Sequence, residues 1–432
     1  MNFKGTPLAW TPLMILLAAC GGGGAGSAAP PKVDSALDAV AERYVKLVLA
    51  VGRHDDLYVD AYYGPPAWKT VAAGGAPTPL PELLAQARAL QADLGKAGGP
   101  ADRKRYLEKQ LVAVEGHLRR LSGEKMTLAE ECRVLYDADP PHHDAAEFEE
   151  AQRKLEALVP GKGPLGPRIE AMRRSVYIPH DKIAPALAAA LQAARTATAP
   201  FVKLPEGEQF VTALVTGKPW GAYNWYLGNY KSRIELNTDL PVEANNLLGT
   251  MCHEGYPGHH VYNVLLERNL VKGKGWVEYT VYPLYSPQSL LAEGSANAGI
   301  DIVFTPEERR RTLTGPIAEA SGVDPKAIAA VDAIRDAMKP LRYVSGEAAR
   351  MLLDNGKPDA EVAEFIRKWG LVTEERSKKS IDFARTYRSY VFNYSLGEDV
   401  VRAYIGDGPD RARKFFDILS RPVVPSDLTK GQ

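Results

Sequence analysis

The stretch Met251-Cys252-His253-Glu254-Gly255-Tyr256-Pro257-Gly258-His259-His260 places three of the chain's eight histidines and one carboxylate within eight consecutive residues. A His-Glu pair followed closely by another histidine is typical of zinc-peptidase helices. In such helices two imidazoles bind the metal, and the glutamate takes a proton from a water on it. The usual HExxH spacing puts the second histidine four positions after the first, one helical turn away. Here Pro257 occupies that position, and the next histidines are His259 and His260.

Pro257 and Gly258 predict a break in this helix. A proline inside a helix clashes with the carbonyl four residues earlier, which here is that of His253. If Pro257-Gly258 loops out, the remaining sequence reads His-Glu-Gly-Tyr-His, and His259 becomes the second ligand. His260 is then a neighbour for orientation or substrate contact, and Tyr256 is a further site candidate. The alternative is a polar helix end broken by Pro-Gly, with histidines at the surface.

The octapeptide from His253 to His260 resembles the hallmark of a bacterial family known as domain of unknown function 885, many of whose members are assigned as lipoproteins. That family is grouped by similarity with the zincin-like metallopeptidases. The segments 58–65 (YVDAYYGP) and 394–397 (YSLG) extend the resemblance over most of the mature chain, and the central motif is the more specific one. The resemblance implies a Zn²⁺ cofactor and a mainly α, gluzincin- or neurolysin-like architecture. Such an architecture has two helical lobes and a small β-sheet next to the metal-binding helix.

A third protein ligand is expected, because catalytic zinc sites combine three protein ligands with one open position for water. The segment 288–304 has the apolar spacing of a helix, and Glu293 is its early acidic residue. Small residues follow Glu293, as they would where this helix packs closely against the motif helix. The resemblance points to the same residue, since the family carries a Glu-Gly-x-Ala pattern there. Asp301, two turns further on, is the alternative ligand.

A tyrosine-rich segment, 385–397, supplies a candidate for a second catalytic role. Zinc peptidases need a hydrogen-bond donor besides the metal to stabilise the tetrahedral oxyanion, and a tyrosine or histidine can supply it. By its position in the family pattern, Tyr394 is the candidate. The alternative for any of these tyrosines is an aromatic helix that packs in the core.

Residues 1–20 have the pattern of a lipoprotein signal peptide. The run 8–17 is largely apolar but too short to span a bilayer, and Leu17-Ala-Ala-Cys20 resembles a lipobox in which Cys20 becomes the lipid-modified N-terminus. Residues 21–32, rich in Gly, Ala, Ser and Pro, are predicted to form a flexible tether. The alternative is an ordinary signal peptide cleaved near Ala19. Gly21, in place of an aspartate after the cysteine, favours the outer membrane, on its periplasmic face.

The composition of the chain excludes several other partners. The chain has 53 basic and 53 acidic residues, so nothing favours nucleic acid, and no second apolar run is long enough to span a membrane. Membrane contact is therefore predicted only through the N-terminal lipid anchor. Apart from Cys20, the cysteines are Cys132 and Cys252. An oxidising compartment permits a bridge between them, and Cys252 is predicted to face the core, opposite His253, and not to be a ligand.

Residues 33–432 are predicted to form one zincin-like metallohydrolase domain, with a helical lobe at 33–200 and a lobe carrying the metal site at 201–432. The alternation in 232–237 predicts a strand, expected to be an edge strand that pairs with substrate backbone. The segment 239–243 is expected to start the metal helix, with Pro241 in its first turn.

The predicted function is zinc-dependent hydrolysis of a peptide or peptide-like substrate in the cell envelope, with Glu254 as general base. The alternative is a non-catalytic envelope lipoprotein that binds peptide or metal in a zincin-derived cleft. A metal hydrolase acting on a non-peptide bond is a more remote alternative.

Overall fold

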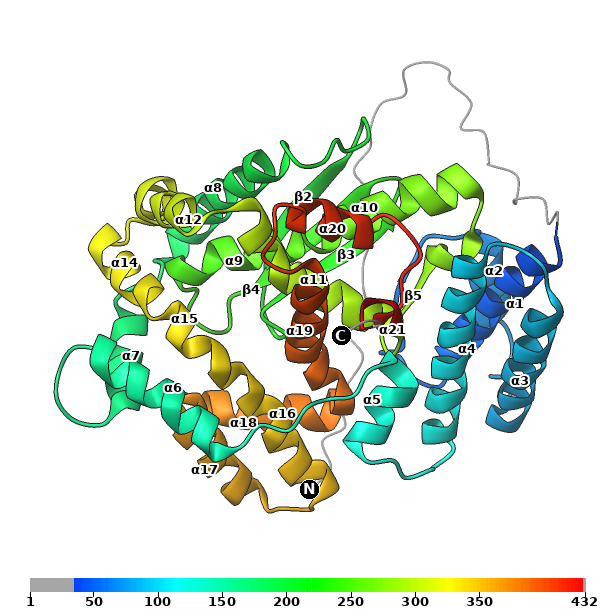
Figure 1. Cartoon of the computed structure of the whole chain (residues 1–432), viewed down its shortest axis with the longest axis horizontal. Helices are drawn as coiled ribbons and strands as arrows, with labels where there is room; N and C mark the ends of the chain where they lie inside the picture. Colours follow the sequence, from blue (N-terminus) through cyan, green and yellow to red (C-terminus); the bar gives the residue numbers. More distant parts are fainter. Residues whose placement is uncertain (1–34, 219, 430–432) are drawn as a thin grey trace. The chain divides into compact units, whose positions relative to one another are not determined.

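Two helices, α11 (Pro287–Val303) and α19 (Asn393–Ile405), lie side by side in the computed structural model, which describes residues 35–218 and 220–429 (Figure 1). Gly294 of α11 faces Gly397 of α19, and a Cβ atom on either residue would collide with the backbone of the other helix. Because glycine has no Cβ, the two backbones can touch. The predicted signal peptide, Cys20 and the tether lie outside the described residues.

The described chain is mainly helical with small sheets, as the sequence predicts. The α-helices and strands are, in chain order, α1 (Ala36–Val51), β1 (Val59–Tyr62), α2 (Pro66–Ala73), α3 (Leu80–Lys96), α4 (Ala101–Leu121), α5 (Leu128–Tyr136), α6 (Ala145–Leu158), α7 (Leu165–Arg174), α8 (His180–Thr198), β2 (Gln209–Val215), β3 (Ala222–Gly228), β4 (Lys231–Asn237), α9 (Ala244–Glu254), α10 (His259–Leu266), β5 (Val281–Pro283), α11, α12 (Pro306–Thr312), α13 (Ala318–Ser321), α14 (Pro325–Ala333), α15 (Arg335–Met338), α16 (Val344–Ala349), α17 (Asp359–Gly370), α18 (Glu374–Tyr387), α19, α20 (Arg411–Ile418) and α21 (Pro425–Leu428).

Polar side chains cap several helix starts. The Thr127 hydroxyl accepts from the backbone N–H of Glu130, whose carboxylate in turn accepts from the N–H of Thr127, at the start of α5. Thr305 and Glu308 form the same reciprocal pair at the start of α12. Each pair satisfies two backbone donors that the first helical turn leaves without a partner.

The three-stranded sheet corrects the predicted role of residues 232–237. They belong to β4, which is the central strand, parallel to β2 and antiparallel to β3. The prediction of an edge strand is wrong, because β2 pairs with the second side of β4. The strand that contacts both α9 and α10 is β3, and no described strand pairs with its outer edge. Strands β1 and β5 form a separate antiparallel pair.

The predicted metal helix starts later than the sequence indicates. Helix α9 begins at Ala244, after the N-cap residue Glu243, so Pro241 lies before the helix and not in its first turn. The backbone N–H of Ala244 donates to the carbonyl of Val176, and Tyr177 forms a β-bridge with Glu243. The end of the segment 239–243, which was predicted to start the helix, is therefore extended and not helical.

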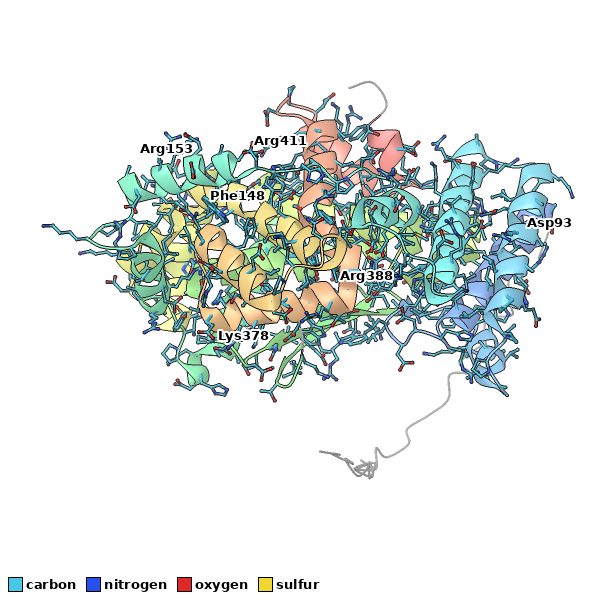
Figure 2. The ribbon with its side chains drawn as sticks, turned by 90° about the horizontal axis from the view of Figure 1, so that it is seen from below. Asp93, Phe148, Arg153, Lys378, Arg388 and Arg411 are labelled. Carbon is cyan, nitrogen blue, oxygen red and sulfur yellow. The ribbon has the colours of Figure 1, made fainter. Side chains whose placement is uncertain are left out.

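The core contains both described cysteines. Cys132 and Cys252 are buried and unpaired, and burial raises the pKa of the Cys252 thiol, which fits the prediction that it faces the core. A second apolar cluster surrounds Phe148, labelled in Figure 2, and includes Ile169 and Trp369. This cluster joins residues from both sides of position 200, and the predicted division into two lobes stays a prediction. Among the described helices, none combines the length and apolar character needed to cross a bilayer.

Candidate metal centre

The predicted break in the motif helix is present. Helix α9 ends at Glu254, Gly255–Gly258 form the break, and α10 begins at His259. The N–H of Gly258 donates to the carbonyl of Cys252 at 2.9 Å, and a Cβ on Gly258 would collide with the carbonyl oxygen of His253. Only glycine permits so close a return of the chain, which brings the His259 side chain back to the His253 side chain.

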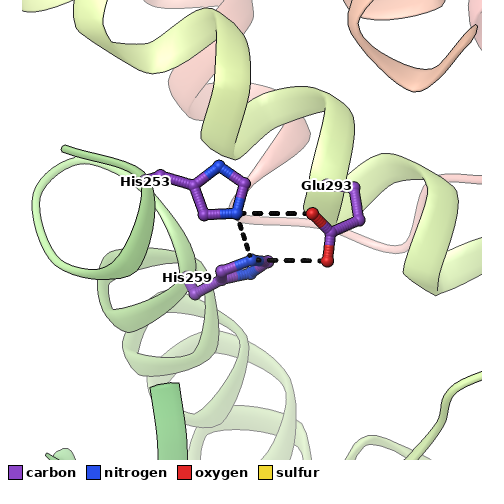
Figure 3. Close-up of side chains that lie close together, drawn as sticks. All are labelled: His253, His259 and Glu293. Atoms are coloured by element: carbon purple, nitrogen blue, oxygen red, sulfur yellow. Dashed lines mark hydrogen bonds and ion pairs between the residues drawn. The ribbon is translucent and has the colours of Figure 1, made fainter. Parts of the chain in front are cut away.

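His253, His259 and Glu293 meet at one point, with their ligand atoms facing one another (Figure 3). The Nε2 atoms of His253 and His259 are 3.0 Å apart. Glu293 Oε2 lies 3.3 Å from His253 Nε2, and Glu293 Oε1 lies 3.6 Å from His259 Nε2. Among the described residues, this is the one group of His, Cys, Asp and Glu side chains whose ligand atoms all lie within 4.8 Å of one another.

This geometry fits a zinc ion. Nitrogen and oxygen ligands about 2.1 Å from one ion, at tetrahedral angles, lie about 3.4 Å from each other. The observed separations of 3.0 to 3.6 Å bracket that value. In addition, Glu293 Oε2 is buried without a hydrogen-bond partner among the described residues, as expected for an atom that serves a metal.

Asn297 orients the first histidine. Its Nδ2 donates to the backbone carbonyl of Tyr394 at 2.8 Å, so its Oδ1 faces His253 Nδ1 at 2.9 Å and accepts the proton there. That hydrogen bond leaves Nε2 of His253 as the nitrogen aimed at Glu293 and His259. Metal-binding histidines are commonly fixed in this way by a partner on the second nitrogen.

Protonation differs sharply between the two histidines in the metal-free protein. Burial lowers the pKa of His253, but the Glu293 carboxylate 3.3 Å away and the charge of Glu254 outweigh burial and raise the pKa to about 9. Burial lowers the pKa of His259 to about 4, although Glu293 opposes the shift. His253 therefore carries the proton at neutral pH, while His259 is neutral.

Glu254 follows His253 directly and has no hydrogen-bond partner for its buried Oε2 among the described residues. Burial and the charge of Glu293 raise its pKa to about 7, against the opposing effect of His253. Its backbone carbonyl, freed by the end of α9, accepts from Asn224 Nδ2 of β3 at 2.6 Å. The carboxylate lines the same cavity as the three ligand residues, and its buried Oε2 is available to exchange a proton.

A cavity of about 1030 Å³ opens onto these groups, and its lining includes Asp60, Asn224, His253, Glu254, Glu293 and Tyr394. The Tyr390 hydroxyl donates to Glu293 Oε1 at 2.7 Å. Tyr394 lines the cavity, and desolvation of its hydroxyl together with the charge of Glu293 raises the pKa of that hydroxyl. Tyr394 therefore stays a protonated donor in the cavity, whereas Tyr390 supports a ligand.

His260 and Tyr256 lie away from this cavity. His260 is fully buried, with Nδ1 2.7 Å from the hydroxyl of Ser232 and Nε2 2.6 Å from Glu208 Oε1. The Tyr256 hydroxyl also donates to Glu208. The predicted substrate contact of His260 is therefore not observed, because the residue after His259 points to the other side of α10. The alternative ligand Asp301 instead forms an ion pair with Arg335.

Sequence reasoning missed three polar residues near the centre. Asn297 lies one helical turn after Glu293, a spacing from which a contact on the same face could have been inferred. Asp60 lies within the conspicuous 58–65 segment, but its position in the cavity depends on strand pairing far along the chain. Tyr390 belongs to the tyrosine-rich segment 385–397, in which the family pattern points to Tyr394 as the oxyanion-stabilising residue.

Comparisons with known proteins concern the fold. No protein-family model and no curated protein matches this sequence. A solved structure described as a "putative lipoprotein" from Colwellia psychrerythraea aligns with 80% of this chain at 14% identity and a TM-score of 0.49, and this chain spans 65% of its length. A second such protein "of unknown function", from Shewanella oneidensis, aligns with 88% of this chain and 76% of its own at 10% identity, with a TM-score of 0.47.

An M32 carboxypeptidase from Deinococcus radiodurans R1 aligns with 91% of this chain and 93% of its own, at 12% identity and a TM-score of 0.35. These similarities are distant, so the function has to be derived from the residues of the site. The resemblance of the central motif to a lipoprotein family stays a prediction.

Proposed function

We propose that this protein is a zinc-dependent metallopeptidase of zincin-like fold, anchored in the bacterial cell envelope through a lipid on Cys20. The observation that carries the proposal is the convergence of His253, His259 and Glu293 at 3.0 to 3.6 Å, with Glu254, whose buried Oε2 has no hydrogen-bond partner among the described residues, in the same cavity. Three ligands and an adjacent carboxylate are what metal-assisted hydrolysis requires.

His253 Nε2, His259 Nε2 and the Glu293 carboxylate would hold the ion, and Asn297 and Tyr390 keep two of these ligands in place. When bound, zinc acts as a Lewis acid that polarises the scissile carbonyl and lowers the pKa of a water. Glu254 accepts a proton from the attacking water at its carboxylate and passes it to the leaving amine. Burial raises the pKa of Glu254 in the metal-free protein, and a carboxyl group with a raised pKa is suited to accept a proton and release it again.

Two further groups favour a peptide as the substrate. Residues 222–225 of β3 line the cavity, and no described strand is hydrogen-bonded to the outer edge of β3, which β1 contacts, so free backbone groups there can pair with an extended peptide. The Tyr394 hydroxyl, held as a donor, can stabilise the oxyanion that develops when the carbonyl is attacked.

The experiment measures zinc content and hydrolysis of a peptide library by the purified protein and by its Glu254→Gln variant. We expect about one zinc per chain in both proteins, and turnover reduced about 10²- to 10⁴-fold in the variant. Full activity in a zinc-loaded Glu254→Gln protein would show that the mechanism is wrong. Zinc without turnover of any peptide would instead favour the non-catalytic binding protein, and turnover of other amides or esters would reassign the substrate.

The anchor has a separate test, because it depends on residues outside the metal centre. Labelling cells with a fatty-acid probe should modify the parent protein and not a Cys20→Ser variant. Recovery of the unmodified variant in the soluble periplasmic fraction would agree with the proposal, and equal labelling of both proteins would contradict it.

A further inference from the structure

Asp60 is a carboxyl group of the cavity wall that the proposed reaction does not use. It lies in β1 at a bulge, because Val59 pairs with Pro283 and Ala61 already pairs with the preceding residue, Tyr282. Asp60 is thus the extra residue of the bulge. Such bulges commonly redirect a side chain near a functional site, and Asp60 lines the same cavity as His253 and Glu254.

The Asp60 carboxylate has a neutral partner. The Tyr223 hydroxyl donates to its Oδ1, and no Lys, Arg or His nitrogen of the described residues lies within 4.0 Å of it. Glu243, in the same cavity, is paired with Arg376 at 2.8 Å. Asp56, at the exposed rim, is solvated. Asp60 is partly buried, and a buried carboxylate without a cation is unfavourable unless a ligand supplies one.

The partner of this carboxylate, Tyr223, belongs to a group of aromatic rings in the cavity lining. The ring of Tyr223 lies 4.6 Å from that of Trp225 and 5.3 Å from that of Trp220. Burial, and then the charge of Asp60, raise the pKa of the hydroxyls of Tyr282 and Tyr387, so both lie within its electrostatic reach. A carboxylate among aromatic faces favours an ammonium ion, which combines an ion pair with cation–π attraction.

The electrostatics of the cavity agree with this chemistry. Burial raises the pKa of Asp60 to about 8, with help from the charges of Glu293 and Glu254. The ionised carboxylate is therefore disfavoured while it has no cation beside it, although Arg376 and Lys218 lie elsewhere in the cavity lining. An ammonium group placed beside Asp60 would favour the ionised form, and an anionic group would oppose it.

We infer that Asp60, with the rings of Tyr223 and its neighbours, binds a primary ammonium group of the substrate next to the metal centre. The inference rests on the proposed function, because the ammonium group is taken to belong to the peptide that is cleaved. The α-ammonium of a peptide N-terminus and the side-chain ammonium of a lysine-like residue both have this chemistry. The first source would make the enzyme an aminopeptidase, and the second would make it selective for basic side chains.

The test uses the zinc-loaded Glu254→Gln protein, which should bind peptides without turning them over. Calorimetry compares three probes: trialanine amide, its N-acetyl form, and N-acetyl-lysyl-alanyl-alanine amide. We expect at least one amine-bearing probe to bind about 10- to 100-fold more tightly than the acetylated trialanine, from an ionic hydrogen bond. The amine that gains affinity identifies the source.

Asp60→Asn, added to this protein, should remove that preference, and Asp60→Glu should restore part of it. Asp56→Asn is the matched control and should keep the full preference. Equal binding of all three probes, no measurable binding of either amine, or an equal loss for all three probes in Asp60→Asn would overturn the inference.

Zinc content and the melting temperature show whether Asp60→Asn remains folded. If it does not fold, Tyr223→Phe, which removes one hydrogen bond to Asp60, should reduce the preference about 3- to 10-fold. An unchanged preference in that variant would then overturn the inference. Amine-selective binding by a protein that hydrolyses no peptide would reject the proposed peptidase activity and leave the ammonium site standing.

Discussion

The motif 253–260 supplies two histidine–carboxylate clusters, which differ in whether their buried carboxylate oxygens and histidine nitrogens all have hydrogen-bond partners. At the metal centre, His253 and His259 face Glu293 across 3.3 and 3.6 Å, and buried oxygens of Glu254 and Glu293 lack hydrogen-bond partners among the described residues. On the other side of α10, His260 is hydrogen-bonded at both nitrogens, to Ser232 and to Glu208, and Glu208 also accepts from Tyr256.

This difference separates a functional cluster from a structural one. Buried polar atoms that have partners hold the fold together, and here they fix α10 against β4 and the segment before β2. Buried polar atoms without partners are unfavourable, and they persist where a ligand completes them. Two adjacent histidines in the sequence are thus expected to respond in opposite ways to the same substitution.

The largest contrast is expected between His259→Ala and His260→Ala. His259→Ala should reduce the zinc content from about one per chain to near zero, because only two ligands remain. His260→Ala should keep its zinc but lower the free energy of unfolding by about 2–5 kcal/mol, from a buried cavity and the loss of one hydrogen bond to Glu208, which keeps Tyr256 and Arg195 as partners. Elemental analysis and denaturant unfolding of both variants measure this. Zinc lost from His260→Ala and kept in His259→Ala would reverse the assignment.

The stability of the metal-free protein and its stabilisation by added zinc should depend on pH in opposite directions. The folded-state pKa of His253, about 9, exceeds the ordinary value of 6.5, so its contribution to stability is fully present below pH 6.5 and is lost as the pH rises through about 9. The raised pKa of Glu254 acts in the same direction. Zinc must displace the proton of His253, so apparent zinc affinity should rise about tenfold per pH unit between pH 6.5 and 9.

Melting temperatures with and without zinc, at several pH values in this window, measure both effects. The metal-free protein should lose this part of its stability over the window while the increase caused by zinc grows. In the His253→Ala variant, both the loss of metal-free stability and the growth of the zinc effect with rising pH should be weaker. A zinc effect that is independent of pH would contradict the protonation of His253.

Neutralising one carboxylate in each cluster gives a smaller contrast. Burial raises the pKa of Glu208, but hydrogen bonds from His260 and Tyr256 outweigh it and lower the pKa, so Glu208→Gln should destabilise the protein by about 1–3 kcal/mol at neutral pH. Glu254→Gln removes a disfavoured buried charge and should leave the metal-free protein at pH 8 as stable as its parent, or more stable. Thermal unfolding of the two variants tests this. An equal loss of stability in Glu208→Gln and Glu254→Gln would contradict the distinction between the two clusters.

The smallest effects are expected from substitutions of Asn297 and Ser232, the hydrogen-bond partners of Nδ1 in His253 and in His260. Asn297→Ala should weaken zinc binding about 10- to 100-fold, because His253 loses the partner that orients it. Ser232→Ala should leave zinc affinity unchanged and lower the free energy of unfolding by about 1 kcal/mol. Competition with a chelator measures the first quantity, and chemical denaturation the second. Equal zinc affinities in the two variants would show that Asn297 is not a positioning residue.

Local chemistry explains which features could be predicted. Pro257 and Gly258 act on their immediate neighbours, so the end of α9 at Glu254 and the restart at His259 followed from the clash of a proline ring and the small size of glycine. The acid of the downstream helix, Glu293, was identifiable because one residue combined the right chemistry with small neighbours. Both inferences needed only a few residues of sequence.

Features set by packing between distant segments could not be predicted. Alternation in 232–237 shows that the strand has two faces, but not that β2 and β3 cover both of its edges. Glu208 reaches His260 only because the segment before β2 folds onto α10, and Asp60 enters the cavity only through the pairing of β1 with β5. The opposite direction of His260 was predictable, since successive helical residues point about 100° apart. The identity of the metal and the lipid on Cys20 stay predictions.

The contact between Gly294 and Gly397 has a consequence for how this protein can change over evolution. Glu293 lies in α11 and Tyr394 lies in α19. The separation of these two helices is fixed by the contact between their backbones at Gly294 and Gly397, and not by side chains. Elsewhere in the core a new side chain can be absorbed by the rearrangement of its neighbours, but here there is no neighbouring side chain to move. The distance between the positions of Glu293 and Tyr394 should therefore stay the same in related sequences, whereas the other side chains that line the cavity can vary.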